Sequence, residues 1–202
     1  MGIKIKFISN IRYAISKFFA RIRNKKLIKR YPFIEYKDYV EKPGKHYYDS
    51  THLDCLPSGW RKSFVPEMLE RIRNVLLRQG EDALKNYSLE QVKEKWGSLR
   101  WYDYGGNDEI DEIISYYEDV SMSVCIQCGK RHSKYITSPY VCFICEKCLK
   151  KHDNLDSREL TWDNIPRRTH YYEDGSSKVL ESKVDFKSIW KKPEETKEKE
   201  NK

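Results

Sequence analysis

The sequence predicts an α+β fold, and three patterns in the 202-residue chain support this prediction. Two stretches, at 58–79 and 108–122, carry apolar residues at the three- and four-residue spacing of amphipathic helices. Between them, 88–104 alternates apolar and polar residues around a Trp-Gly pair, which is typical of a β-hairpin. Five cysteines then fall within 24 residues, at 125–148. We therefore expect a small core of helix, β-hairpin and helix, followed by a cysteine-rich module.

Composition places the chain among folded proteins. Hydrophobic residues make up 39% and charged residues 35%, so the chain is more polar than an average globular domain. Aromatic residues reach 13%, which argues for a folded core because disordered chains are poor in aromatics. No apolar run approaches the ~20 residues of a membrane-spanning helix, and charged residues interrupt any secretory h-region. We expect a protein of the reducing cytoplasm whose clustered thiols bind metal.

The positive charge is concentrated at the N-terminus. Residues 1–30 hold six Lys, four Arg and no acid, so they carry +10, whereas the other 172 residues carry −2. Stretch 7–28 predicts a basic amphipathic helix that ends at Tyr31-Pro32, because the residue before a proline disfavours the helical conformation. Its apolar stripe comprises Ile8, Ile11, Ile15, Phe18 and Ile22.

This basic arm (residues 1–30) supports three interpretations. Its cations Arg12, Lys17, Arg21, Arg23, Lys25 and Lys26 could contact nucleic acid phosphates. The charges and the apolar stripe together could bind an anionic membrane surface. The stripe could instead pack against the body of the protein or against another copy.

The core elements follow in chain order. Segment 31–57 is aromatic and turn-rich, and we expect its Tyr31, Phe33, Tyr36 and Tyr39 to pack on the body. The first core helix covers 58–79, with Ser58 as its N-cap and Gly80 as its stop signal. Pro66 predicts that this helix is kinked or begins only near Ser63.

The second half of the core has clear boundaries. A short helical stretch at 81–87 precedes the hairpin, whose turn is Trp96-Gly97. Gly105-Gly106 ends the second strand, and Asn107 or Asp108 caps the helix over 108–122. These elements give a core domain at 31–123.

The hairpin also carries a candidate ligand surface. Its strands place Lys93, Lys95 and Arg100 where they could share one face, with Trp60 and Trp101 nearby. A cationic and aromatic surface of this kind can stack a base and bind phosphate. The alternative is a solvated strand face above an aromatic core, neutralised by Glu90 and Glu94.

The cysteines predict a zinc ribbon at 124–152. Cys125-x2-Cys128 and Cys145-x2-Cys148 are separated by 16 residues, within the spacing that is typical of Zn²⁺ sites. Two Cys-x-x-Cys turns joined by a hairpin at 134–144 can supply four thiolates to one ion. Because four thiolates close the coordination shell, we expect a structural rather than a catalytic zinc.

The sequence also allows other residues to be metal ligands. Cys142-x2-Cys145 is a second Cys-x-x-Cys, although Cys142 lies in an apolar, strand-like run. His132 and His152 could replace a cysteine as a metal ligand, but they are less favoured than the four thiolates. Beyond the ribbon, 153–192 is a polar extension with a hairpin around Asp174-Gly175, and 193–202 is predicted to be a disordered tail.

Three motifs resemble a family of small proteins from phages, prophages and gut bacteria. They are Leu-Asp-Cys-Leu-Pro-Ser-Gly-Trp-Arg at 53–61, Gln-Val-Lys-Glu-Lys-Trp-Gly-Ser-Leu-Arg-Trp-Tyr at 91–102 and the Cys-x-x-Cys-Gly pair. The similarity covers about residues 31–150. In that family the second knuckle follows a Gly-Trp-aliphatic strand, and Pro139-Tyr140-Val141 takes its place here, which favours Cys145 and Cys148 as ligands. The resemblance implies a phage or mobile-element setting and supplies no activity.

These observations predict a non-enzymatic zinc-binding protein of phage or mobile-element type that binds nucleic acid or a nucleotide in the host cytoplasm. Interference with host defence is one form of this function. The alternative is a structural or assembly protein that binds host or phage proteins and is associated with the virion. A metal-dependent hydrolase or nuclease using Asp54 is less favoured, because no phosphate-binding glycine loop or nucleophile motif is present.

Overall fold

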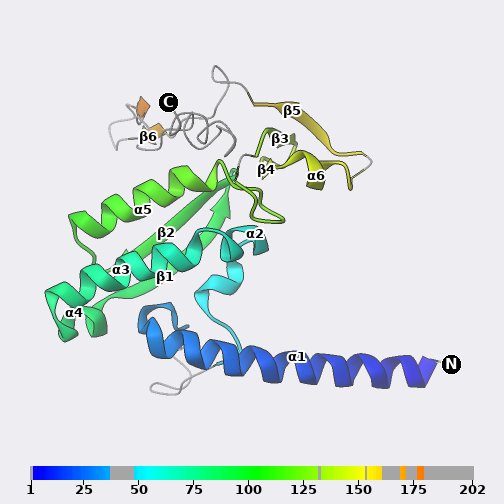
Figure 1. Ribbon diagram of the computed structural model, residues 1–202, viewed down its shortest axis with the longest axis horizontal. Coiled ribbons are helices and arrows are strands. Elements are labelled where there is room, and N and C mark those ends of the chain that lie inside the picture. The colour runs from blue at the N-terminus through cyan, green and yellow to red at the C-terminus, as the bar shows by residue number, and fades with distance from the viewer. Residues whose placement is uncertain are drawn as a thin grey trace, which may run out of the picture.

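The computed structural model describes residues 2–36, 48–131, 133–152, 154–160, 169–171 and 177–179 (Figure 1), with side chains from Tyr13 to Leu160 within these ranges. The helices are α1 (Gly2–Arg30), η1 (Pro32–Ile34), η2 (His52–Cys55), α2 (Ser58–Lys62), α3 (Val65–Gln79), α4 (Glu81–Asn86), α5 (Asp108–Ser121) and α6 (Glu146–Leu149). The strands are β1 (Ser88–Lys95), β2 (Ser98–Tyr104), β3 (Tyr135–Ser138), β4 (Phe143–Ile144), β5 (Asp156–Glu159), β6 (Thr169–Tyr171) and β7 (Ser177–Val179). No helix in the described ranges has the length and apolar character needed to cross a membrane.

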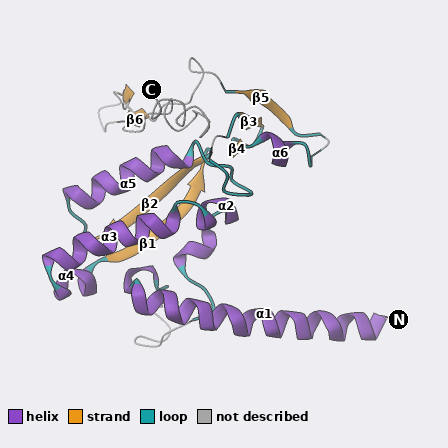
Figure 2. Ribbon diagram, viewed as in Figure 1, coloured by secondary structure: helices purple, strands orange, loops and turns teal. Residues whose placement is uncertain are grey.

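The mixed helix and sheet composition confirms the α+β class. Figure 2 shows α3 and α5 running alongside the β1–β2 hairpin, with α1 below them as a separate long rod. One continuous hydrophobic cluster joins α3, α5 and the inner face of the hairpin. Its largest fully buried side chains include Trp60, Phe64, Tyr87 and Tyr117, and Phe64 stacks on Tyr117.

The stretch expected to form one helix at 58–79 is divided. α2 ends at Lys62 and α3 begins at Val65, with Pro66 in its first turn, where the missing N–H of proline costs nothing. Ser58 is the first residue of α2 and not its N-cap, which is Pro57. Gly80 ends α3 with a φ of +114°, as predicted for its stop signal.

The hairpin and the helix after it match their sequence patterns. Lys95 pairs with Ser98 across a two-residue turn, in which Trp96 and Gly97 both have positive φ. Positive φ at both positions is typical of the type I′ turn, whose twist suits a hairpin. Asn107 caps α5, because its side chain accepts a hydrogen bond of 3.0 Å from the Ile110 N–H.

The N-terminal segment is more ordered than expected. α1 ends at Arg30, directly before Tyr31-Pro32, as predicted. Tyr31 and Phe33 are buried against the core, where Phe33 meets Tyr87 edge to face. Tyr36 instead is exposed, contrary to the expectation that it packs on the body, and Tyr39 lies outside the described residues.

The C-terminal part contains more sheet than the sequence predicted. β3 pairs with β4, as expected for the hairpin between the knuckles, but it also pairs with β5 on its other edge. β6 and β7 form the hairpin expected around Asp174-Gly175, although the turn itself lies outside the described residues. The tail at 193–202 also lies outside them.

Candidate metal centre and basic hairpin face

Four cysteines converge at one point. The sulfur atoms of Cys125, Cys128, Cys145 and Cys148 all lie within 4.8 Å of one another, and three of the four residues are buried. The Sγ atoms of Cys128 and Cys145 are 3.7 Å apart, too far for a disulfide. A tetrahedral ion with metal–sulfur bonds of about 2.3 Å would place sulfur atoms about 3.8 Å apart. The cluster could therefore bind a metal ion.

Backbone hydrogen bonds shape both knuckles. In the first, the Gly129 N–H donates to the Cys125 carbonyl and the Cys125 N–H donates to the Lys130 carbonyl, each at 2.9 Å. Gly129 has a φ of +80°, which glycine adopts without strain. In the second, the Cys148 N–H donates to the Cys145 carbonyl at 3.0 Å; Cys145 is the N-cap of α6 and Cys148 lies within this helix. Each knuckle thus turns two thiols toward the same point.

The thiols influence one another electrostatically. Burial opposes ionisation of Cys128, but hydrogen bonds from the Lys130 backbone and from the other three thiols outweigh it and lower its pKa to about 7. Burial, together with the neighbouring sulfurs, raises the pKa of Cys148 to about 12. Several thiolates at this distance repel one another strongly unless a cation lies between them. The donor set is therefore suited to a cation that prefers sulfur.

The core holds the first knuckle in place. The Gly59 N–H of α2 donates to the Ile126 carbonyl at 3.0 Å, and the Ser58 hydroxyl donates to the Gln127 carbonyl at 3.1 Å. A Cβ on Gly59 would lie 2.2 Å from the Cys125 carbonyl oxygen, so only glycine fits this contact. This contact was not predictable from the sequence, because it joins residues far apart in the chain.

Of the remaining candidate ligands, Cys142 and His152 lie outside the cluster. Cys142 is half-buried, and its Sγ lies 3.0 Å from the Thr137 hydroxyl oxygen. His152 is exposed, with its Nε2 2.6 Å from the Gln127 side-chain nitrogen. His132 lies outside the described residues. The geometry thus selects Cys145 and Cys148 over the alternative that pairs Cys142 with Cys145.

The hairpin brings its three cations to one face. Lys93 lies opposite Arg100, Lys95 opposite Ser98, and Gln91 opposite Tyr102, so these six side chains share a side of the sheet. Lys95 and Tyr102 are exposed, and the Lys93 ammonium lies 5.5 Å from the centre of the Tyr102 ring. Glu94 is on the other side, where its carboxylate accepts a bond from the Gly97 N–H. We call these six residues the basic hairpin face; none of them is acidic.

The two tryptophans expected on this surface are elsewhere. Trp60 and Trp101 are buried in the core, and the Trp101 indole donates to the Tyr87 hydroxyl at 3.1 Å. Because side chains alternate along β2, Trp101 faces inward when Arg100 and Tyr102 face outward. The expectation that the cations and these two tryptophans share one surface is therefore wrong. The exposed tryptophan of the hairpin is Trp96 at the turn, with 69% of its surface accessible.

Several cations of the basic arm already contact other parts of the protein. Arg21 forms an ion pair with Asp49, Arg23 contacts Asp54, and the Lys25 ammonium lies over the Tyr48 ring. Lys17 and Lys26 are exposed, and the side chain of Arg12 is not among those described.

The apolar stripe of the arm is accessible. Ile15, Phe18 and Ile22 are exposed, with 60% of Phe18 accessible, and they follow one face of α1. Residues at 21, 24 and 28, on a different face, contact the body. These three residues of the stripe therefore do not pack on the described part of the body.

Together, the fold and the site define an α+β protein with a four-cysteine cluster that could bind a metal ion. Comparisons with protein-family models, with curated proteins and with solved structures found no match.

Proposed function

We propose that the protein is a non-enzymatic nucleic-acid-binding protein whose fold is held by a structural zinc at Cys125, Cys128, Cys145 and Cys148. Thiolates prefer soft or borderline ions, and zinc adopts the tetrahedral geometry that this cluster offers. Four protein ligands leave no open position for a reacting water, which supports a structural role. The phage or mobile-element setting remains a proposal from the resemblance alone.

The choice of ligands can be tested by exchanging two neighbouring cysteines. Cys142→Ser is expected to retain one zinc per chain, because Cys142 bonds to Thr137 and lies outside the cluster. Cys148→Ser is expected to lose tight zinc binding, because it removes one of four ligands. Elemental analysis of each purified variant after dialysis measures the zinc. Loss of zinc from the Cys142 variant, with retention in the Cys148 variant, would support the alternative register, in which Cys142 and Cys145 are ligands and Cys148 is not.

The basic hairpin face is the observation that carries the nucleic-acid proposal. Lys93, Lys95 and Arg100 offer charge to phosphates, and Tyr102 offers a ring on which a base can stack. Proteins that bind single strands combine these two features. Of the two acids that could have neutralised the face, Glu94 is occupied at the turn on the opposite side. Glu90 is exposed at the bulge before Gln91, where its carboxylate accepts a hydrogen bond from the Ser88 hydroxyl at 3.2 Å.

Trp96 adds a second observation. It has a φ of 55°, which is an unfavourable conformation for a bulky residue, and it contributes little to the core because it is largely exposed. Asn-Gly is the favoured sequence for this turn type, so a tryptophan here opposes local stability. Backbone strain of this kind supports a functional role for the side chain. We assign Trp96 to stacking on an unpaired base.

The test uses Trp96→Asn. The variant is expected to be more stable by about 1 kcal/mol, because asparagine tolerates the left-handed conformation. It is also expected to bind a labelled single-stranded oligonucleotide more weakly by about 1–3 kcal/mol, the contribution of one stacked base. Thermal melting and fluorescence anisotropy measure the two effects. Tighter folding with unchanged binding would exclude Trp96 from the interface.

A charge variant with a matched control tests the phosphate contacts. Lys93→Gln with Lys95→Gln should reduce the slope of log affinity against log salt by about 1.4, the expectation for two phosphate contacts on a single strand. Arg78→Gln with Lys85→Gln removes the same charge from α3 and α4 and serves as the control. Equal effects of the two double variants would indicate a general charge effect and contradict a binding site on the hairpin.

A further inference from the structure

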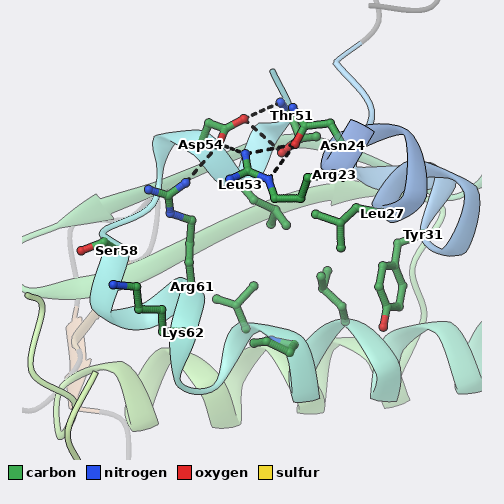
Figure 3. Close-up of a pocket in the computed structure, with 13 residues that line it drawn as sticks. Arg23, Asn24, Leu27, Tyr31, Thr51, Leu53, Asp54, Ser58, Arg61 and Lys62 are labelled. Atoms are coloured by element: carbon green, nitrogen blue, oxygen red, sulfur yellow. Dashed lines mark hydrogen bonds and ion pairs between the residues drawn. The ribbon is translucent and has the colours of Figure 1, made fainter. Parts of the chain in front are cut away.

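A cavity of about 360 Å³ lies between the C-terminal half of α1 and the α2–α3 region (Figure 3). This volume falls within the range of small-molecule sites. The cavity is distinct from the cysteine cluster and from the basic hairpin face, since it shares no residue with either. It is also the place where the basic arm meets the core.

Most of the surface that lines the cavity is apolar, and five aliphatic residues contribute to it. Leu27 comes from α1, Leu53 from η2, and Val65, Pro66 and Leu69 from α3. Leu53, Val65 and Leu69 are themselves buried, so they form a rigid floor. Tyr31 closes one end, and its hydroxyl donates to Glu70 at 2.8 Å and is not offered to the cavity. An aliphatic chain, more than a polar ring, suits this lining.

The other end of the cavity is cationic. Figure 3 shows the guanidinium groups of Arg23 and Arg61 directed toward Asp54. Both contact the same oxygen, Oδ1, at 3.4 Å and 3.1 Å. Oδ2 of Asp54 accepts from the Thr51 N–H at 2.8 Å, which caps η2. Asp54 is thus occupied by this capping role and by two arginines.

Positive charge remains after this pairing. Lys62 also lines the cavity and forms no ion pair with any residue in the described ranges. Three cations therefore face one carboxylate. The Nε of Arg61 is buried and has no acceptor within the described part of the chain. Because solvent does not reach this atom, a head group in the cavity would meet the terminal guanidinium nitrogens of Arg61 instead.

We propose that this cavity binds a small anionic amphiphile: an aliphatic chain in the apolar part, ending in a carboxylate or phosphate that accepts hydrogen bonds from Arg61 and is attracted by Arg23 and Lys62. Arginine suits both head groups because its N–H groups match their oxygens. The inference does not depend on the nucleic-acid proposal, because it uses none of the hairpin residues.

Isothermal titration calorimetry of the full-length, zinc-loaded protein tests this proposal. Decanoate or decyl phosphate is expected to bind, and the tighter of the two identifies the head group. Decanol, which lacks the charge, and inorganic phosphate, which lacks the chain, are both expected to bind at least about ten-fold more weakly, because each loses one of the two interactions. Equal binding of decanol, or of phosphate alone, would overturn the proposal, as would no binding of either amphiphile.

Variants of the lining residues test whether the amphiphile binds in this cavity. Arg61→Gln is expected to weaken binding of the preferred amphiphile about ten-fold or more, as for loss of a charged hydrogen bond. Leu27→Trp is expected to fill the cavity and abolish binding. Arg78→Gln, a change in an exposed arginine on α3, should leave the affinity unchanged. Melting temperatures of all variants identify loss of folding. Wild-type affinity in a folded Arg61 variant would place the ligand elsewhere and overturn the proposal.

Discussion

Removal of the metal is expected to unfold the whole core and not only the cysteine module. Structural zinc contributes about 10–16 kcal/mol of apparent binding free energy in small domains, which matches or exceeds the ~5–15 kcal/mol stability of a typical domain. The module is also continuous with the core, since α2 bonds to the first knuckle through Gly59 and Ser58. Far-UV circular dichroism with a chelator and a reductant measures the outcome: the helical signal, which includes α3 and α5, should fall.

Two controls sharpen this experiment. Added zinc should restore the helical signal, whereas magnesium should not, because magnesium prefers oxygen ligands. A chelated protein that keeps its helical signal and its melting temperature would show that the four thiols do not support the fold through a metal. Loss of only a small part of the signal would show that the module unfolds independently of the helices.

Gly59→Ala is expected to destabilise the protein by about 3 kcal/mol or more, through a backbone clash. The new Cβ would lie 2.2 Å from the Cys125 carbonyl oxygen and 2.6 Å from that of Ile126, and neither can move without distorting the knuckle. Intrinsic helix propensity predicts the opposite sign, a gain of about 1 kcal/mol for alanine over glycine. Denaturant titration of the zinc-loaded variant measures the change.

Gly106→Ala is the matched control. Its Cβ would lie 2.6 Å from the Asp103 carboxylate, which is the movable end of a side chain, so the cost should stay below about 1 kcal/mol. We also expect the Gly59 variant to bind zinc more weakly, because the displaced backbone belongs to a ligand residue. A Gly59 variant as stable as the control would show that α2 and the knuckle are not coupled.

The local features were predictable because short-range chemistry determines them. The Cys-x-x-Cys spacing indicated which four thiols meet, and the structure brings those four together. The Trp96-Gly97 turn and the Asn107 cap were also identified correctly, since each depends on a few adjacent residues. The zinc ion itself remains a prediction, because the cluster indicates a metal site without identifying the metal.

Features that depend on distant residues were not predictable in the same way. Alternation shows that Trp101 and Arg100 face opposite sides, but only tertiary packing determines which side is the core. The close contact of Gly59 with the Cys125 carbonyl joins segments more than sixty residues apart. The cavity likewise needs α1, η2 and α3 together, and no pattern in the sequence predicted it.

The pairing of β5 with β3 has a consequence for the design of shorter chains. A fragment ending at His152 would contain every cysteine, yet it would leave one backbone edge of β3 unpaired. Such an edge is a template for pairing with another molecule, so the fragment would tend to aggregate. Leu160 is buried, and its N–H donates to the Lys134 carbonyl at 2.6 Å. The smallest fragment that keeps this strand protected therefore extends through Leu160.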